Sequence, residues 1–353
     1  MKITFPYWGN YTIAFEKLAK KLGLEVVPPE KTTEKTIEKG AKIAPEMYCF
    51  PLKVNLGNFL EAIERGADTI VMATALGGSC RLRYYAIVED KILKDEGKKV
   101  NFVIFDQSPL DIYSKLKKIS GASFFQFLNS ALFTLKTIKI IEKLEKKAQF
   151  LRPREKEKGE TDRFLNSAFR RLRKIEKFFD LLKFEREILK EMAQIKYERK
   201  EVPKVGIVGE IYTVTDHSIN FEIERKLGNL GIEVHREMSL FYHLKKKIFP
   251  WIDWKIQRKI KNYLDSTVGG HGRDAIYEML KYVKEDFDGV IQILPFACMP
   301  ETTVRPILEK IHQETGIPFL SLSLDEQVAE AGLNTRIEAF VDVVKNYYGK
   351  KKS

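Results

Sequence analysis

The sequence predicts an α/β fold with two similar doubly wound parallel-sheet domains and an inserted helical hairpin. Both ends of the chain alternate short apolar runs with segments of helical periodicity, whereas the middle shows helical periodicity alone. An order of strand, helix and strand implies parallel sheets with right-handed crossovers. We therefore expect an N-terminal α/β domain at 1–120, a helical insert at 121–200 and a C-terminal α/β domain at 201–353.

The N-terminal third contains four predicted strands and two predicted helices. The run at 68–72 is continuously apolar, which is typical of a strand buried on both faces. Gly23 and Gly66 are natural stop signals for the helices that precede them. The other predicted strands are 3–5, 24–27 and 100–105, and the helices are 15–22 and 51–65.

The middle of the chain predicts two long helices. From Phe124 to Phe150, apolar residues recur every three or four positions. A polar break at 152–159 follows, and the same spacing resumes from Phe164 to Leu189. The two helices would pack against each other as a hairpin that protrudes from both sheets. Exposed Phe and Leu side chains on this hairpin would indicate a dimer interface.

The last third returns to alternation and resembles the first. Residues 22–26 read Leu-Gly-Leu-Glu-Val, and residues 230–234 read Leu-Gly-Ile-Glu-Val, each after a helix that follows a first strand. The match favours a duplicated α/β unit. The predicted strands are 205–208, 232–235, 289–294 and 319–322, and the predicted helices are 220–230, 274–285 and 303–314.

Composition excludes several classes of protein. The 353 residues are 44% hydrophobic and include only three cysteines, which is too few for a disulfide framework. The start has no run typical of a signal peptide, and the most apolar window, 121–135, is too short to span a bilayer. We expect a cytoplasmic protein with reduced thiols and no membrane contact. Abundant Lys and Glu with few Gln indicate a thermophile.

The net charge of +12 allows two interpretations. Much of the excess lies between residues 136 and 200, where a nucleic-acid patch is one reading. The solvated faces of long helices are the other, because Lys and Glu interleave there at helical spacing. We favour the second reading, since no recognised nucleic-acid motif accompanies the charge.

The three cysteines occupy loops rather than apolar core positions. Cys80 follows the predicted strand 68–72, and Cys298 follows the predicted strand 289–294. Ligands of open α/β sheets bind outside the carboxyl ends of the strands, so these two cysteines lie at the expected edge. Cys49 opens a helix, and a Cys-x-Pro sequence occurs at both Cys49 and Cys298. Proline close after cysteine is frequent beside iron–sulfur ligands.

The residues alone leave several interpretations of these thiols open. Free cysteine is often a buried structural residue. Structural zinc is disfavoured, because there is no Cys-x-x-Cys pair and no histidine at zinc-finger spacing. A catalytic pair with His217 or His271 lacks a nucleophile motif. A cubane cluster held by three thiolates would leave one iron open to a substrate.

At these cysteines the chain resembles the 2-hydroxyacyl-CoA dehydratase and benzoyl-CoA reductase component family. The most similar branch is the acyl-CoA dehydratase activase-related proteins, often called CoA enzyme activases. The resemblance covers nearly the whole chain and is carried by the three cysteine segments 46–53, 78–85 and 295–301, by Gly209-Glu210-Ile211-Tyr212, and by residues 325–326 and 335–340.

The resemblance implies a [4Fe–4S] cluster between the two domains, ligated by Cys49, Cys80 and Cys298. It also implies radical dehydration or reduction of a CoA thioester or other small molecule, in an anaerobic setting, with low-potential electrons from a separate ATP-dependent activator. No Gly-x-x-x-x-Gly-Lys-Ser/Thr string occurs here, so we place ATP on that partner. A non-catalytic electron carrier or activation partner is the alternative, and a basic nucleic-acid-binding protein is the third hypothesis.

Five further residues are candidates for catalysis. Arg81 and Tyr84 follow Cys80 and could donate hydrogen bonds to cluster sulfide or an anionic substrate, although an ion pair and a packed ring are equally ordinary roles. Glu46 fits an acid/base role or a helix cap. Glu210 follows a strand at the predicted edge. His271 lies in the Gly-rich stretch 269–272, which precedes a helix.

Overall fold

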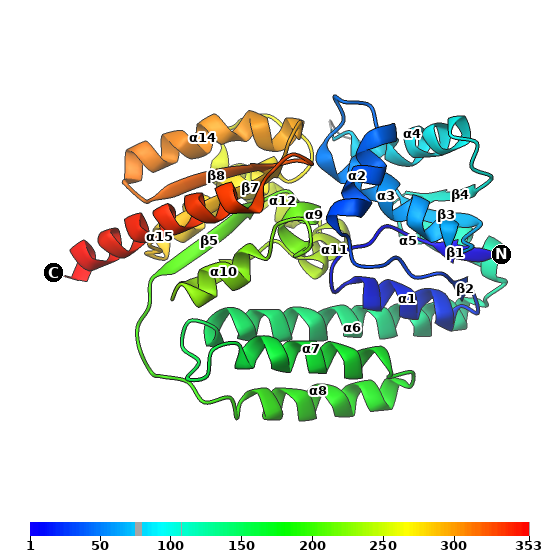
Figure 1. The fold of residues 1–353 in the computed structure, drawn as a ribbon, viewed down its shortest axis with the longest axis horizontal. Helices are drawn as coiled ribbons and strands as arrows, with labels where there is room; N and C mark the ends of the chain where they lie inside the picture. Colours follow the sequence, from blue (N-terminus) through cyan, green and yellow to red (C-terminus); the bar gives the residue numbers. More distant parts are fainter. Residues whose placement is uncertain (75–79, 107, 353) are drawn as a thin grey trace.

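The computed structural model describes residues 1–74, 80–106 and 108–352, and it confirms an α/β fold with two parallel-sheet domains (Figure 1). Each sheet has four parallel strands, in the orders β2-β1-β3-β4 and β6-β5-β7-β8. The two orders are the same, as expected of similar domains. The strands are β1 Lys2–Thr4, β2 Glu25–Val26, β3 Thr69–Ala73, β4 Asn101–Phe105, β5 Lys204–Gly209, β6 Glu233–Arg236, β7 Gly289–Pro295 and β8 Phe319–Leu324.

Helices flank both sheets. The structure adds helices that periodicity does not delimit, among them α2, which starts at a capping box formed by Thr33 and Thr36. The flanking helices are α1 Thr12–Lys21, α2 Glu34–Ile43, α3 Phe50–Glu64, α4 Leu82–Asp95, α5 Pro109–Ser120, α9 Ile211–Thr215, α10 Ile223–Asn229, α11 Leu240–Ile248, α12 Trp251–Ile260, α13 Gly272–Lys284, α14 Met299–Thr315 and α15 Glu330–Lys352.

The insert has three helices, so the predicted hairpin of two is wrong. They are α6 Phe124–Leu151, α7 Glu160–Arg173 and α8 Phe178–Met192. The expected second helix is broken between α7 and α8, where α1 binds the free carbonyl groups. Lys17 Nζ donates to the Arg173 carbonyl (3.1 Å), and Lys21 Nζ donates to the Glu176 carbonyl (2.6 Å).

The insert packs on the N-terminal domain through α6. Ile13 and Ala14 of α1 share an apolar core with Phe133 and Ile138 of α6. Figure 1 shows α6 running alongside both sheet domains, with α7 and α8 stacked on its far side, away from the sheets. The domain boundaries at 120 and 200 stay a prediction.

Helix α3 joins the two domains. Its residues from Phe50 to Phe59 are all buried, and Phe50 and Val54 pack in one core with Val205 and Ile207 of β5. On its other side α3 touches α2 backbone to backbone, because a Cβ on Gly57 would lie 1.9 Å from the Thr36 carbonyl oxygen. The start of α3, which carries Cys49, is therefore fixed from both sides.

Replacing Gly57 by alanine should destabilise the protein by roughly 2–3 kcal/mol, because the methyl group meets a backbone atom that cannot move aside. The loss should appear despite the gain of up to about 1 kcal/mol that alanine brings to a helix interior. Gly332 of α15 has open space around its Cβ position, so Gly332→Ala is the matched control and should be neutral or stabilising. Urea unfolding midpoints measure both, and equal effects would contradict the close approach.

A buried ionic network joins the insert to both domains. Arg236 of β6 lies between Glu145 of α6 (2.9 Å) and Glu224 of α10 (2.6 Å). Asn10 of the N-terminal domain donates to Glu145 (2.7 Å), and His217 lies 3.6 Å from the same carboxylate. One cluster of charges thus connects three parts of the molecule.

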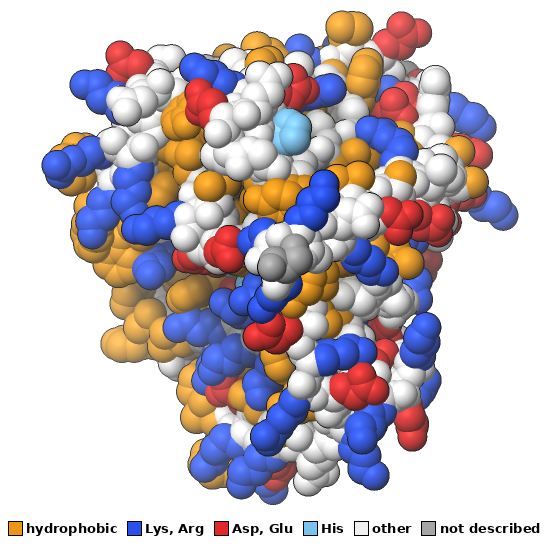
Figure 2. Space-filling view, turned by 90° about the vertical axis from the view of Figure 1, so that its left-hand side faces the viewer, with side chains coloured by type: hydrophobic (Ala, Val, Ile, Leu, Met, Phe, Trp, Pro, Cys, Tyr) orange, Lys and Arg blue, Asp and Glu red, His pale blue; other side chains and the backbone are white. Residues whose placement is uncertain are grey.

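The surface charge is mixed. Figure 2 shows Lys and Arg side chains spread among acidic and apolar ones on the face that carries the C-terminus. Within the residues that the structure describes, no helix is long and apolar enough to cross a membrane.

Candidate functional site

The site lies at the switch points of the two sheets. In each sheet, the second strand along the chain lies on one side of the first strand, and the third strand lies on its other side. The crevice therefore falls between β1 and β3 in one sheet and between β5 and β7 in the other. Glu210 and Cys298 follow β5 and β7, and the Glu210 amide donates to the Ile293 carbonyl (3.2 Å). Cys80 follows β3 after residues 75–79, which include Gly77, Gly78 and Ser79 of its motif and lie outside the described residues.

Cys298 is presented by a tight turn between β7 and α14. Its amide donates to the Pro295 carbonyl (3.0 Å), and Ala297 takes a left-handed conformation with φ of 61°. A non-glycine residue in that region is uncommon and marks a constrained turn. Pro300 lies in the first turn of α14, where its missing N–H costs nothing.

Cys49 is brought to the same place from the N-terminal domain. The amide of the next residue, Phe50, donates to the carbonyl of Phe296, two residues before Cys298 (3.3 Å). The Cys49 thiol also forms a short hydrogen bond with the buried hydroxyl of Tyr85 in α4. The cysteine segments of the two domains are thus in direct contact.

Arg81 joins the segments of Cys80 and Cys49. Its guanidinium donates to the carbonyl of Met47 and lies 5.8 Å from the ring centre of Tyr48. Burial raises the pKa of Cys49, and the charge of Arg81 opposes part of that rise. Of the candidates, Arg81 thus lies in the site, where it positions the loop before Cys49.

The Cys49 thiol is coupled electrostatically to Cys80 and to Cys298. Burial raises the pKa of Cys49 to about 11, against the hydrogen bond from Tyr85, and the Cys80 thiol adds to the rise. Burial also raises the pKa of Cys80 and that of Cys298, and Cys298 is affected by Cys49. The convergence of the three thiols on one cleft and their role as ligands stay predictions.

Two carboxylates face the thiols. The charge of Glu210 raises the pKa of all three cysteines. Glu210 caps α9 and accepts from the amides of Tyr212 (3.0 Å) and Thr213 (2.9 Å). This candidate therefore lies near enough to each of the three cysteines to influence its ionisation.

Glu301 is the second carboxylate, and it was not predicted from the sequence. Its side chain is buried in the first turn of α14, and burial raises its pKa to about 8. Gln292 donates to Oε2 (3.0 Å), while Oε1 has no hydrogen-bond partner within the described part of the chain. The signal in the sequence is an acidic residue three positions after a cysteine that starts a helix.

The other three candidates lie away from the thiols or on the surface. Glu46 is exposed in the turn before Cys49, and Tyr84 is 52% exposed. Tyr85, the residue after Tyr84, is the one that contacts Cys49. His271 pairs with His243 (3.1 Å), and burial, with the charge of a nearby lysine, lowers its pKa to about 3. These positions do not support catalytic roles for Glu46 or Tyr84.

The thiols fit an iron–sulfur cluster by their chemistry. All three precede helices α3, α4 and α14, whose N-termini favour negative charge. Arg81 adds a cation at Cys49, and the Tyr85 hydroxyl can donate to a ligated sulfur. In residues 1–74, 80–106 and 108–352, no three Cys, His, Asp or Glu side chains are arranged around a single metal ion. A cubane instead takes one thiolate at each of several irons.

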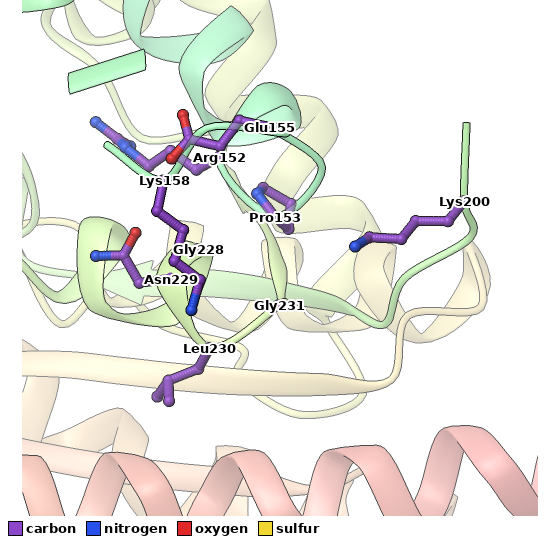
Figure 3. Close-up of a pocket in the computed structure, with 9 residues that line it drawn as sticks. All are labelled: Arg152, Pro153, Glu155, Lys158, Lys200, Gly228, Asn229, Leu230 and Gly231. Carbon is purple, nitrogen blue, oxygen red and sulfur yellow. The ribbon is translucent and has the colours of Figure 1, made fainter. Parts of the chain in front are cut away.

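A hollow elsewhere contains none of these residues. It lies between the loop after α6 and the turn after α10 (Figure 3), and the ammonium of Lys200 at its rim is paired with Glu198 (2.9 Å). Its walls are Arg152, Pro153, Glu155, Lys158, Lys200, Gly228, Asn229, Leu230 and Gly231.

Glu89, behind the site, should make stability depend on pH. It is fully buried, accepts from Asn55 (3.2 Å), and burial raises its pKa from 4.5 to about 8. Between these values the folded state binds more protons than the unfolded state, so stability falls as pH rises, by up to about 1.4 kcal/mol per pH unit.

Glu89→Gln should remove the contribution of Glu89 to the fall of the free energy of unfolding with pH, between about pH 5 and pH 8. Urea unfolding of the cluster-free protein at several pH values measures it. Glu96→Gln, at an exposed position after the same helix, is the control and should keep the wild-type slope. Parallel wild-type and Glu89→Gln profiles would contradict the assignment.

The fold and the site define a two-domain α/β protein in which the segments of three cysteines meet near the switch points of the sheets. A model of the 2-hydroxyglutaryl-CoA dehydratase D-component family matches residues 110–344, more than half of the chain. The chain therefore belongs to this family. A model described as a CoA enzyme activase uncharacterised domain matches residues 4–76. The comparison with curated proteins found no match.

The cysteines do not all lie within one of the two matched ranges. Cys49 lies in the range of the activase-type model and Cys298 in that of the dehydratase model, whereas Cys80 lies between the two ranges. The expected relation to dehydratases and CoA enzyme activases is confirmed. The chain is a component of the 2-hydroxyacyl-CoA dehydratase type.

Proposed function

We propose that the chain carries a [4Fe–4S] cluster on Cys49, Cys80 and Cys298 and uses it to reduce or dehydrate a CoA thioester or another small molecule. The Cys49 and Cys298 segments come from different domains and meet where the Phe50 amide donates to the Phe296 carbonyl. This contact is the main support for the proposal. The family is an iron–sulfur-dependent one, which supports the same reading.

The surrounding residues would orient and protect the group. Arg81 holds the Met47 carbonyl and so fixes the loop before Cys49, while Tyr85 offers a hydroxyl to the Cys49 sulfur. Such hydrogen bonds tune the potential of a cluster. When bound, the cluster would supply low-potential electrons and one iron without a thiolate.

Glu301 is suited to hold a proton beside the site. Because burial raises its pKa to about 8, its carboxyl group is mostly protonated at neutral pH. The unpartnered Oε1 can give that proton to a reacting oxygen or carbon. Glu210 is already engaged by the amides of α9, so we assign it a role in setting the charge around the thiols.

Electrons would come from a separate ATP-dependent activator, as the family matches suggest. The test is to load the protein with iron and sulfide anaerobically, reduce it with that activator and ATP, and add a panel of CoA thioesters. Conversion of a thioester supports an enzyme. Reduction without conversion of any thioester would support the alternative, an electron carrier. A protein that the activator cannot reduce contradicts both.

A further inference from the structure

An uncharged helix face lies open on the insert. Residues 119–135 contain no Asp, Glu, Lys, Arg or His, although 31% of the chain is charged. The first half of α6 falls in this stretch and exposes Phe124, Phe125, Leu128 and Leu132. Their spacing puts all four on one side of the helix, opposite the side that packs in the core. We call these four residues the α6 strip.

Apolar side chains continue on both flanks of the α6 strip. On one flank, Tyr113 of α5 lies 5.5 Å from Phe124 between ring centres, and Leu110 of the same helix is exposed. On the other, the buried Phe133 lies 6.3 Å from Phe178, which with Phe179 starts α8. Both α8 residues are exposed, so the apolar surface extends over three helices.

The area of this surface fits a stable protein interface. Phe124, Phe125, Phe178 and Phe179 are 54%, 76%, 44% and 71% exposed. With about 200 Å² for a whole Phe side chain, these four alone leave roughly 500 Å² of ring in solvent. The three leucines bring the total toward the ~800 Å² that each partner buries in a standard interface. Patches on monomers rarely exceed about 600 Å².

We propose that the α6 strip and its flanks bind a second copy of this chain as a symmetric dimer. A two-fold axis places the same residues against themselves, and an uncharged helix face meets its own copy without repulsion at the centre. Phenylalanine-rich cores without charge are typical of such interfaces. An acidic partner would need cations within the strip, and residues 119–135 contain none.

The test is sedimentation velocity over a range of concentrations. The wild type should reach twice the chain mass of 41.0 kDa, whereas Phe125→Asp with Leu128→Asp should stay at 41.0 kDa, with a dimer dissociation constant raised on the order of 100-fold or more. Because both side chains are exposed, the variant should fold, which its circular dichroism checks. Ile248→Asp, at an exposed apolar residue of α11, is the control and should dimerise.

Ionic strength gives a second readout. Each copy has a net charge of +12, so added salt should tighten the dimer by screening the repulsion between the two copies. A wild type that is monomeric at every concentration overturns the proposal. So does a double variant that still dimerises, or a monomer that binds anionic vesicles through the same strip. The proposed dimer does not depend on the cluster, so cluster-free protein is used in each of these experiments.

Discussion

Replacing Cys298 by serine should lower the iron bound by anaerobically loaded protein from about four per chain to less than one. Thiolates anchor the cluster, and a serine hydroxyl does not ionise at neutral pH to replace one. Two attachment points would remain, on Cys49 and Cys80, which is too few for a labile core. Serine fills nearly the same space as cysteine at this buried position, so the fold should persist. Iron assay and the absorbance of the cluster measure the result.

His271→Ala and His217→Ala are the matched controls for iron content. His271 pairs with His243, and His217 lies against Glu145 in the ionic network, so the known partners of both histidines are residues other than the cysteines. Both variants should keep nearly all of the iron. If His271→Ala removes the cluster as effectively as Cys298→Ser, the fourth iron is ligated by the protein. The substrate-binding role would then give way to electron transfer.

Replacing Arg236 by methionine should destabilise the protein by about 3–5 kcal/mol. The Arg236 side chain is almost fully buried between Glu145 and Glu224, and the methionine leaves both carboxylates buried without their cation. Its Nη1 also donates to the Met238 carbonyl (2.6 Å), a bond that is lost as well. Three parts of the molecule meet at this network, so the whole structure should lose stability together.

Arg171→Met is the control for Arg236. Arg171 pairs with Glu191 (2.6 Å), yet both side chains are exposed, and such pairs contribute about 0–1 kcal/mol. Urea unfolding of both variants in the cluster-free state measures the difference. An equal loss in the two variants would show that the buried network does not join the domains as described.

Local patterns predicted the strands well, because buried parallel strands read as short apolar runs. The runs at 68–72 and 289–294 correspond to β3 and β7, the third strand of each sheet. The rule that ligands bind beyond strand ends then indicated where Cys80 and Cys298 belong. Identical strand order in both sheets agrees with the repeat seen at 22–26 and 230–234.

Features that depend on side chains far apart in the chain could not be predicted from the sequence. The break between α7 and α8 rests on Lys17 and Lys21, more than 150 positions earlier in the chain. The sequence did not single out Tyr85, which contacts Cys49 because the phase of α4 turns Tyr85 and not Tyr84 toward the core. The burial of Glu301 could not be predicted, because it depends on how α14 packs on β7.

The central claim is that three cysteines of one chain hold one cubane cluster. Iron and acid-labile sulfide, measured in anaerobically reconstituted wild-type protein after removal of unbound metal, test it most directly. We expect about four irons and about four sulfides for each 41.0-kDa chain. A protein that retains less than one iron per chain under these conditions would contradict it.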